Sequence, residues 1–261
     1  MGTSKAALEW HGSTLLRRTT GVLARAVDGC VLVVRAPGQP LPELDPAVEV
    51  AEDPAEGLGP LQGLAAGLAA VAGRAEVAFV CSTDLPFLHP AFVRRVLAAV
   101  DEHTDVVLPE ARGFPQPLAA AYRTTLAPLV DKLIAAGRLR PAFLFEECRV
   151  TRLDDATLLA DPVLAAHDPQ LDSVLNVNEP TDYDSARGRA APEITVQRYG
   201  ALATANDQRG PRSIPAATLA AAAAAAGLTL DRHVVAVLNG DQISRDGHLP
   251  LAPGDSIVFL S

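Results

Sequence analysis

The sequence predicts an α/β protein in which helices cover both faces of a doubly wound, mostly parallel sheet, followed by a smaller α+β domain. In residues 1–187, short apolar runs alternate with segments of helical periodicity. This alternation is typical of buried parallel strands joined by crossover helices. Residues 188–192 contain Gly188, Arg189 and Pro192 and indicate a linker. Residues 193–261 then carry strand and helix signals of their own.

The elements of the first domain follow from periodicity and turn residues. The Gly-Pro pair at 59–60 precedes a helix, because proline is favoured in a first helical turn. Gly137 ends another helix. Predicted helices cover residues 13–27, 61–71, 90–100 and 126–136, and predicted strands cover residues 30–34, 47–51, 77–81, 106–108 and 118–122.

Composition excludes several classes of function. The chain has 261 residues, 49% of them hydrophobic, and a net charge of −9. It has no uncharged apolar run of the roughly 18 residues that suggest a membrane span. It also has no signal-peptide pattern and no basic patch that would bind nucleic acid. We therefore expect a cytoplasmic protein that binds neither membrane nor nucleic acid.

Cysteine and lysine usage adds two expectations. Cys30, Cys81 and Cys148 are odd in number, widely spaced and without a C-x-x-C pair. We expect them to be reduced and mostly buried thiols. Of the 22 basic residues, only Lys5 and Lys132 are lysines, so a lysine is unusual in this chain.

Candidate site residues follow the predicted strands, because ligands of open α/β sheets bind beyond the carboxyl ends of the strands. Asp84 stands just after the strand at 77–81 and is followed by Leu85 and Pro86. A carboxylate at this place can hold Mg²⁺, which takes one or two carboxylates together with phosphate oxygens. The alternative is that Asp84 caps the next helix or turn.

The loop after the strand at 47–51 is a second candidate. Its glycines allow backbone N–H groups to approach a base or a phosphate, and a helix N-terminus follows. Asp53 can accept hydrogen bonds from a base edge or a ribose. The alternative is an ordinary flexible loop with proline at the helix start.

Two further positions bracket the domain. Lys5 offers a compact charge that can follow a phosphate during transfer, although a solvated terminus is the alternative. Asn176 and Asn178 end a short predicted strand before Pro180 and can position phosphates or contact a metal. Their alternative role is a helix cap.

These motifs, in this order, resemble the molybdenum cofactor guanylyltransferase (MobA) family. The family pattern runs from a Gly-rich loop ending in R-M-G-x-D-K, through D-x-x-P-x-x-G-P-L-x-G, D-x-P and Q-P-L, to N-x-N-x-P. One motif alone is weak evidence, whereas five in order are strong. The resemblance covers roughly residues 1–187. The matching segments are residues 1–5, 53–63, Asp84-Leu85-Pro86, Gln116-Pro117-Leu118 and residues 176–180.

The resemblance implies a Rossmann-like nucleotidyltransferase that moves GMP from GTP to molybdopterin and releases pyrophosphate. It implies that Lys5 and Asp84 are catalytic, with Asp84 holding Mg²⁺ and Lys5 contacting the triphosphate. Molybdoenzymes or other cofactor-biosynthesis proteins are possible partners. By the same resemblance, the nucleotide site comprises Gly2, Lys5, Asp53, Gly59, Pro60, Leu61 and Asp84, and the second-substrate site comprises Gln116, Asn176 and Asn178.

The family's first strand and most of its phosphate loop have no counterpart in residues 1–261, and Ser4 stands where the family has Asp. We expect translation to start upstream of Met1, which corresponds to an internal Met of the family. Without that strand, two neighbouring strands lack ladder partners and a buried slot stays empty. We therefore expect residues 1–261 alone to have very weak activity.

The second domain is predicted to be a β-grasp. Strands are expected at residues 194–199, 234–238 and 256–260, with a helix at 216–226 and turns at Asn239-Gly240 and Pro253-Gly254. This domain resembles the MoaD/ThiS ubiquitin-like sulfur carriers. Those carriers end in Gly-Gly, whereas this sequence ends in Leu260-Ser261, so we expect docking rather than sulfur transfer.

Two other interpretations of the whole chain stay open. One is a cytidylyl- or other nucleotidyltransferase. The other is a degenerate binding or regulatory protein, because the Gly-rich loop is absent.

Overall fold

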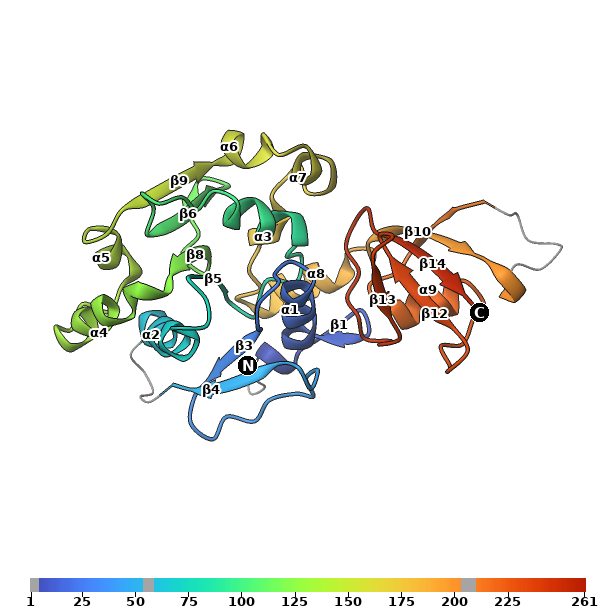
Figure 1. Cartoon of the computed structure of the whole chain (residues 1–261), viewed down its shortest axis with the longest axis horizontal. Coiled ribbons are helices and arrows are strands. Elements are labelled where there is room, and N and C mark those ends of the chain that lie inside the picture. Colours follow the sequence, from blue (N-terminus) through green and yellow to red (C-terminus); the bar gives the residue numbers. More distant parts are fainter. Residues whose placement is uncertain (1–4, 54–58, 203–209) are drawn as a thin grey trace.

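The computed structural model describes residues 5–53, 59–202 and 210–261 and has two bodies side by side (Figure 1). The larger N-terminal body ends with α8, and the smaller C-terminal body starts with β10. The helices are α1 (Leu15–Ala24), α2 (Pro60–Val71), α3 (Pro90–Leu97), α4 (Ala127–Ala135), α5 (Pro141–Phe145), α6 (Asp155–Leu159), α7 (Pro162–His167), α8 (Pro180–Gly188) and α9 (Leu219–Ala225). The strands are β1 (Glu9–Trp10), β2 (Ser13–Thr14), β3 (Leu32–Arg35), β4 (Glu49–Glu52), β5 (Val77–Cys81), β6 (Val106–Ala111), β7 (Phe114–Pro115), β8 (Ala119–Arg123), β9 (Val150–Asp154), β10 (Glu193–Arg198), β11 (Arg212–Pro215), β12 (Val235–Leu238), β13 (Gln242–Ser244) and β14 (Ser256–Leu260).

The main sheet of the N-terminal body is mixed, so the prediction of a mostly parallel sheet is wrong. Its strand order is β5-β8-β6-β7, with β9 paired to β6. The β5–β8 and β8–β6 pairs are antiparallel, and only β6–β9 is parallel. Residues 112–118 alone separate β6 from β8, whereas a parallel crossover needs about a dozen residues. The chain instead turns back at Arg112 and Gly113, whose φ angles are +57° and +82°.

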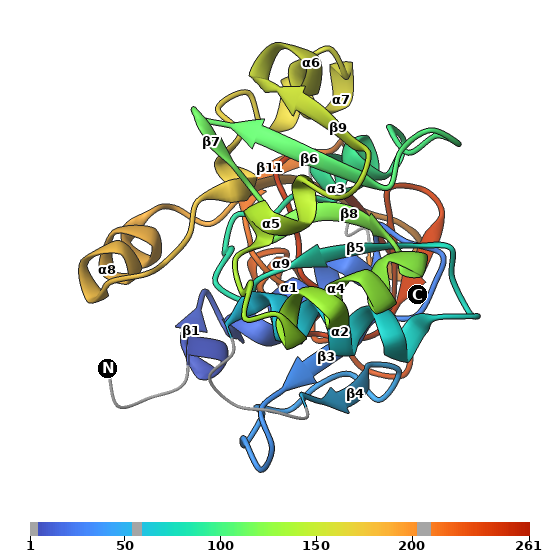
Figure 2. The same ribbon diagram turned by 90° about the vertical axis from the view of Figure 1, so that its left-hand side faces the viewer.

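Helices cover both faces of this sheet, as predicted. One apolar core joins α1, α3, α6 and α7 to one face, through Val22, Phe92, Leu158 and Leu164 among others. A second core joins α2, α4 and α5 to the opposite face, through Leu61, Val130 and Leu144 among others. The helices α2 and α4 lie side by side toward the viewer in Figure 2.

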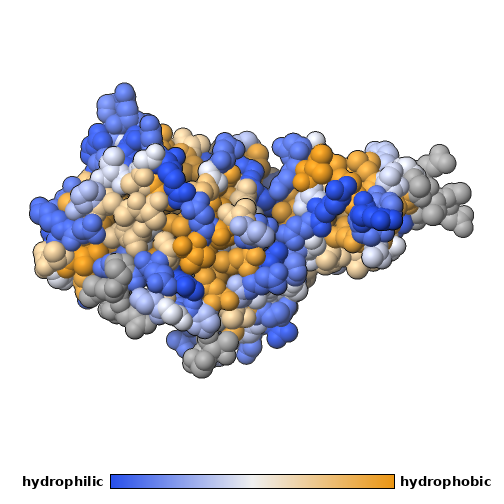
Figure 3. Space-filling model, turned by 60° about the horizontal axis from the view of Figure 1, so that its bottom comes forward, coloured by the Kyte–Doolittle hydropathy of each residue, from blue (hydrophilic) through white to orange (hydrophobic). Residues whose placement is uncertain are grey.

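The N-terminal body has a gap between β3 and β5. Among the described strands, β3 pairs only with β4, in parallel, and β5 pairs only with β8. A cavity of about 660 Å³ lies between them, lined by residues 31–34, residues 77–81 and the apolar sides of α1 and α2. The sequence led us to expect a slot at this place. Figure 3 shows apolar surface gathered near the middle of the larger body.

Most predicted elements agree with the structure, and two local predictions are wrong. The strand expected at residues 174–178 is absent from the described chain, since Asp172–Val174 forms a 3₁₀ turn and extended backbone follows. Cys30 is exposed rather than buried, because it precedes β3 instead of lying within it. Burial raises the pKa of the Cys81 thiol to about 12 and that of Cys148 to about 11. No helix in the described segments is long and apolar enough to cross a bilayer.

The C-terminal body is a five-stranded sheet with one helix. Its strand order is β11-β10-β14-β12-β13, with β10 and β14 parallel at the centre and the other pairs antiparallel. Leu219 and Ala222 of α9 pack on Val196 and Ile257 to form its core. Thr218 caps α9 by accepting a hydrogen bond from the Ala221 N–H.

The turn at residues 250–255 joins the two bodies. The Arg25 guanidinium lies 2.6 Å from the Asp255 carboxylate, and only 4% and 6% of these side chains are exposed. Asp255 also accepts hydrogen bonds from Ala252 N and Asn239 Nδ2, so its buried charge is well satisfied. Arg25 donates further to the Pro250 carbonyl. A buried pair of this kind is costly to break from one side.

Replacement of Gly254 in this turn should destabilise the protein more than the same replacement of Gly240. Its φ is +82°, and an added Cβ would lie 2.1 Å from the His167 ring. Gly240 has a φ of +87° but nothing within 4 Å of an added Cβ. Gly240→Ala should therefore cost about 1 kcal/mol of backbone strain, and Gly254→Ala about 2 kcal/mol more through overpacking. Urea denaturation of both variants measures this, and equal losses would contradict it.

His89 predicts a pH dependence. Its Nδ1 accepts from the Ala91 N–H, so Nε2 carries the proton and donates to the Pro253 carbonyl at 3.1 Å. Burial lowers the pKa of His89 to about 4, while Asp255 opposes this and His167 and Arg25 reinforce it. Because the unfolded imidazole takes up a proton near pH 6.5 and the folded one does not, stability is lost as the pH falls from about 6.5 to about 4.

The loss should reach about 3 kcal/mol at the acid end. Denaturation curves at several pH values should show this component in the native protein and in the exposed control His103→Asn. It should be missing in His89→Asn, whose side chain does not titrate. The same pH slope in both variants would contradict the assignment.

Candidate functional site

The loop after β5 carries the first candidate residue. The Ser82 N–H donates to the Leu118 carbonyl, which keeps this loop beside the start of β8. Asp84 follows two residues later and does not cap the next helix. That helix, α3, begins at Pro90 and is capped by His89. The capping alternative for Asp84 is therefore excluded for α3.

Lys5, Asp84 and Asn178 lie together although they are far apart in the sequence. The Lys5 ammonium is 3.2 Å from Asp84 Oδ2 and 3.1 Å from Asn178 Oδ1. The Asp84 side chain is mostly buried, with 13% exposed, whereas that of Lys5 is 37% exposed. A cation and a carboxylate thus share a half-open position beyond the end of β5.

The Asn-x-Asn segment is fixed mainly through its backbone. The Val177 N–H donates to the Asp84 carbonyl at 3.0 Å. The Asp182 carboxylate accepts from the N–H groups of Asn178 and Glu179, and α8 starts at Pro180. Asn176 is exposed and so is open to a ligand. Glu179 and Asp182 form the capping box of α8, so the alternative that an Asn side chain caps this helix is wrong.

The buried atoms of the β5 loop fit a magnesium ion. Asp84 Oδ1 is buried and has no hydrogen-bond partner, and the same holds for Ser82 Oγ. Buried acceptors without partners are uncommon in folded proteins and often mark an ion or water site. In the described residues, no three His, Cys, Asp or Glu side chains cluster as a metal cage. Mg²⁺ does not need one, because it is commonly held by one or two carboxylates and substrate phosphates.

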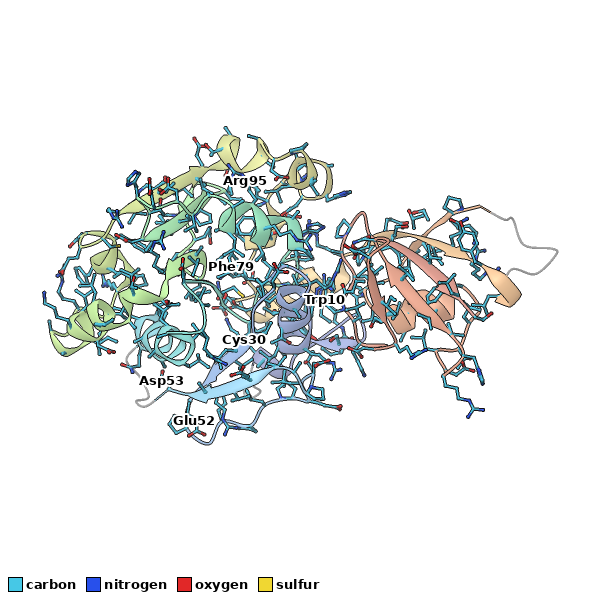
Figure 4. The ribbon with its side chains drawn as sticks, in the orientation of Figure 1. Trp10, Cys30, Glu52, Asp53, Phe79 and Arg95 are labelled. Atoms are coloured by element: carbon cyan, nitrogen blue, oxygen red, sulfur yellow. The ribbon has the colours of Figure 1, made fainter. Side chains whose placement is uncertain are left out.

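The loop after β4 holds the other candidates. The Asp53 N–H donates to the Arg35 carbonyl, and Figure 4 shows Asp53 where β4 ends, next to α2. Gly59 has a φ of +75° and precedes Pro60 at the start of α2. The Leu61 side chain is fully buried, so only its backbone can face a ligand.

Two predicted residues are less informative. Gln116 lies two residues before Leu118, but its side-chain amide donates to the Ala111 and Phe114 carbonyls within its own hairpin. Gly2 lies outside the described residues.

Sequence reasoning did not single out Ser82 or Asp182. The Ser82 hydroxyl lies in the same loop as Asp84, but no sequence pattern shows that a hydroxyl is buried without a partner. Asp182 does carry a sequence signal. It stands three residues after Glu179, which precedes α8, and an acidic residue at this position commonly accepts hydrogen bonds from backbone N–H groups at the helix start. That signal identifies it as the residue that orients the Asn178 backbone.

An α/β sheet covered on both faces, with a lysine, an aspartate and an asparagine at the end of β5, defines a nucleotidyltransferase. Residues 1–152 match the model of the MobA-like NTP transferase domain. The chain belongs to this family.

Related proteins agree with this assignment. A protein of Mycobacterium avium named probable molybdenum cofactor guanylyltransferase is 40% identical over 141 residues, which cover 52% of this chain and 70% of that protein. Its namesake in Mycobacterium tuberculosis H37Rv is 39% identical over 157 residues, covering 59% and 76% of the two chains.

Solved structures show the same fold at low sequence identity. Molybdopterin-guanine dinucleotide biosynthesis protein A of Archaeoglobus fulgidus aligns with a TM-score of 0.53 and 21% identity, over 71% of this chain and 90% of that one. A 4-diphosphocytidyl-2C-methyl-D-erythritol synthase aligns with a TM-score of 0.53 and 14% identity, over 70% and 92%. These likenesses bear on the fold alone.

Proposed function

We propose that this nucleotidyltransferase acts in molybdenum cofactor biosynthesis and moves GMP from GTP to molybdopterin. The observation that carries the proposal is the contact of Lys5 with Asp84 and Asn178, beside the buried and unpartnered Asp84 Oδ1. The names of the mycobacterial relatives support the choice of substrates. A cytidylyl- or other nucleotidyltransferase remains the second candidate for the test below.

The chemistry asks for positioning and charge neutralisation. A phosphate oxygen of molybdopterin attacks the α-phosphorus of GTP, the bond to the β-phosphate oxygen breaks, and pyrophosphate leaves. Transfer of this kind needs little covalent participation by the protein. Lys5 neutralises charge that develops on the triphosphate. Lys5 is partly exposed, and its partners are one carboxylate, Asp84, and one amide, Asn178. It can therefore turn toward a phosphate.

Asp84 is the residue that would hold Mg²⁺, through the oxygen that lacks a protein partner. When bound, the metal would neutralise phosphate oxygens as a Lewis acid. Asp84 also contacts Lys5 through Oδ2. The Asp182 bonds to the backbone at residues 178–179 hold Asn178 next to that pair.

Substrate selection is assigned to the flanking loops. Asp53 and the backbone at residues 59–61 recognise the guanine nucleoside. Asn176, Asn178 and Gln116 contact molybdopterin. The exposure of Asn176 and the position of Asn178 support this division.

We also propose that the C-terminal body is a β-grasp domain similar to the MoaD/ThiS carriers and serves as a docking module. A central parallel β10–β14 pair, with α9 on one face, supports this assignment. Molybdoenzymes or other proteins of cofactor biosynthesis are the partners that it fits. Deletion of residues 193–261 would test docking by its effect on partner binding.

Asp84 gives a direct test of the metal site. Asp84→Asn should abolish saturable Mn²⁺ binding measured by electron paramagnetic resonance, because the remaining amide carries no negative charge. Pyrophosphate release should fall by about 100-fold or more, as for loss of one group that stabilises a transition state. Glu102→Gln, at an exposed position, should change neither quantity. Unchanged Mn²⁺ affinity in Asp84→Asn would contradict the assignment.

Asp53 gives a test of nucleotide choice. With Mg²⁺, GTP should raise the melting temperature more than CTP, because only a bound nucleotide shifts the folding equilibrium. Asp53→Asn should reduce the GTP-to-CTP affinity ratio by about 10-fold, the worth of one charge-assisted hydrogen bond. Glu52→Gln, whose native side chain pairs with Arg35 at 2.8 Å, is the neighbouring control. Equal stabilisation by GTP and CTP would favour a transferase of another specificity.

A further inference from the structure

A second cavity lies at the junction of the two bodies and is separate from the Lys5–Asp84–Asn178 cluster. Its volume is about 330 Å³, and both bodies supply its walls, with Pro253 coming from the C-terminal turn. This volume lies at the lower end of the ~300–1,000 Å³ common for ligand pockets. Its lining includes Trp10, Arg18, Phe87, His167, Arg189 and Pro253.

Arg18 is the unusual member of this lining. It is 3% exposed, and its guanidinium stacks on Trp10 at 4.3 Å. It donates from Nε to the Pro86 carbonyl and from Nη1 to the Leu251 carbonyl. No acidic group of the described residues lies within ion-pair distance of it, because the nearby Asp255 pairs with Arg25 instead. Both of its protein acceptors are therefore neutral.

A buried cation with only neutral acceptors is costly. Desolvation, reinforced by Arg25, lowers the pKa of Arg18 to about 9. The two carbonyls use two of the five guanidinium N–H groups, and Nη2 makes no hydrogen bond to the described residues. Nη2 is not sealed off either, since it is absent from the buried atoms without partners. Free donors of a stacked guanidinium thus border the cavity.

The carboxylates of the cavity wall are already bound by other groups. Arg189 stacks on Phe87 at 4.5 Å and pairs with Asp172. The same Asp172 carboxylate also pairs with Arg112. Asp168 uses its two oxygens to accept from the N–H groups of residues 172 and 173. Arg18 and Arg189 therefore share the wall with two carboxylates, Asp168 and Asp172, and both carboxylates are already engaged.

We propose that this cavity binds a compact phosphate-bearing ligand, with Arg18 as its buried counter-charge and Arg189 at its edge. Stacked guanidinium groups with free N–H donors suit the several oxygens of a phosphate better than a single-point cation does. Because Arg18 and Pro253 connect the cavity to both bodies, the ligand also strengthens their docking. The site does not depend on the transfer reaction proposed above.

The first test measures binding of phosphate and pyrophosphate by isothermal titration calorimetry. It uses full-length Asp84→Asn protein with a chelator, so that metal-dependent binding at the nucleotide site is suppressed. We expect saturable binding of at least one of the two anions, with none for chloride at equal ionic strength. GMP as a third probe shows whether the phosphate is carried on a larger molecule. The proposal is overturned if no probe saturates the protein at concentrations up to about 10 mM, because a dissociation constant above that value is too weak for a specific site.

Variants locate the binding. Arg189→Gln, on a side chain that is 43% exposed, should weaken the anion by about 10-fold without unfolding the protein. Arg95→Gln removes an arginine on α3 whose only hydrogen bonds to the described residues go to the Thr157 carbonyl. Arg95 lies away from Trp10 in Figure 4, so affinity should not change. An equal effect of both variants means nonspecific screening and overturns the proposal.

Arg18→Met tests the buried charge itself. If Arg18 only clamps two carbonyls, this variant loses stability to the same extent with and without the anion. If the proposal is right, the anion raises the melting temperature of the protein with Arg18 and no longer raises that of Arg18→Met. Should Arg18→Met not fold, Arg18→Lys keeps the charge and should bind about 10-fold more weakly, since the fork of donors is lost. Unaltered affinity in Arg18→Lys and Arg189→Gln together overturns the assignment.

Discussion

The loop between β5 and α3 is the constraint on which the rest of the molecule depends. Within eight residues, its backbone and side chains contact five positions that are distant in the sequence. Ser82 holds the start of β8, and Asp84 holds both Lys5 and Val177. The Pro86 carbonyl accepts a hydrogen bond from Arg18, and His89 donates one to the Pro253 carbonyl of the C-terminal body. Displacing this loop would disturb the candidate catalytic cluster and the junction of the two bodies together.

The Lys5–Asp84 pair gains its geometry from that loop rather than from its own attraction. A partly exposed ion pair contributes only about 0–1 kcal/mol, too little to hold two side chains in one place. The backbone bond from Val177 to Asp84 and the bonds from Asp182 to residues 178–179 supply the missing order. Loss of the Lys5–Asp84 contact would therefore leave the surrounding backbone hydrogen bonds in place.

Sequence reasoning reached the parts that local pattern encodes. Apolar runs bounded by turn residues predicted β5 and β14 at their observed bounds, and motif order led to Lys5, Asp84 and Asn178. It failed on the direction of β8, which depends on pairing between strands rather than on either strand alone. It also did not identify Arg18. Helical periodicity predicts which residues face inward, but not which backbone carbonyls accept their hydrogen bonds. The exposure of Cys30 was also missed, because the predicted strand began at residue 30 whereas β3 begins at Leu32.

Helix α1 of the N-terminal body carries residues that contact the C-terminal body. Arg18, Gly21 and Arg25 are spaced by three and four residues, so they lie on one side of the helix. All three meet the C-terminal body: Arg18 and Arg25 bind Leu251, Pro250 and Asp255, and a Cβ at Gly21 would lie 2.6 Å from Pro250. Other residues of α1, such as Leu16 and Leu23, line the cavity between β3 and β5. The same helix therefore contacts the C-terminal body and borders the cavity between β3 and β5.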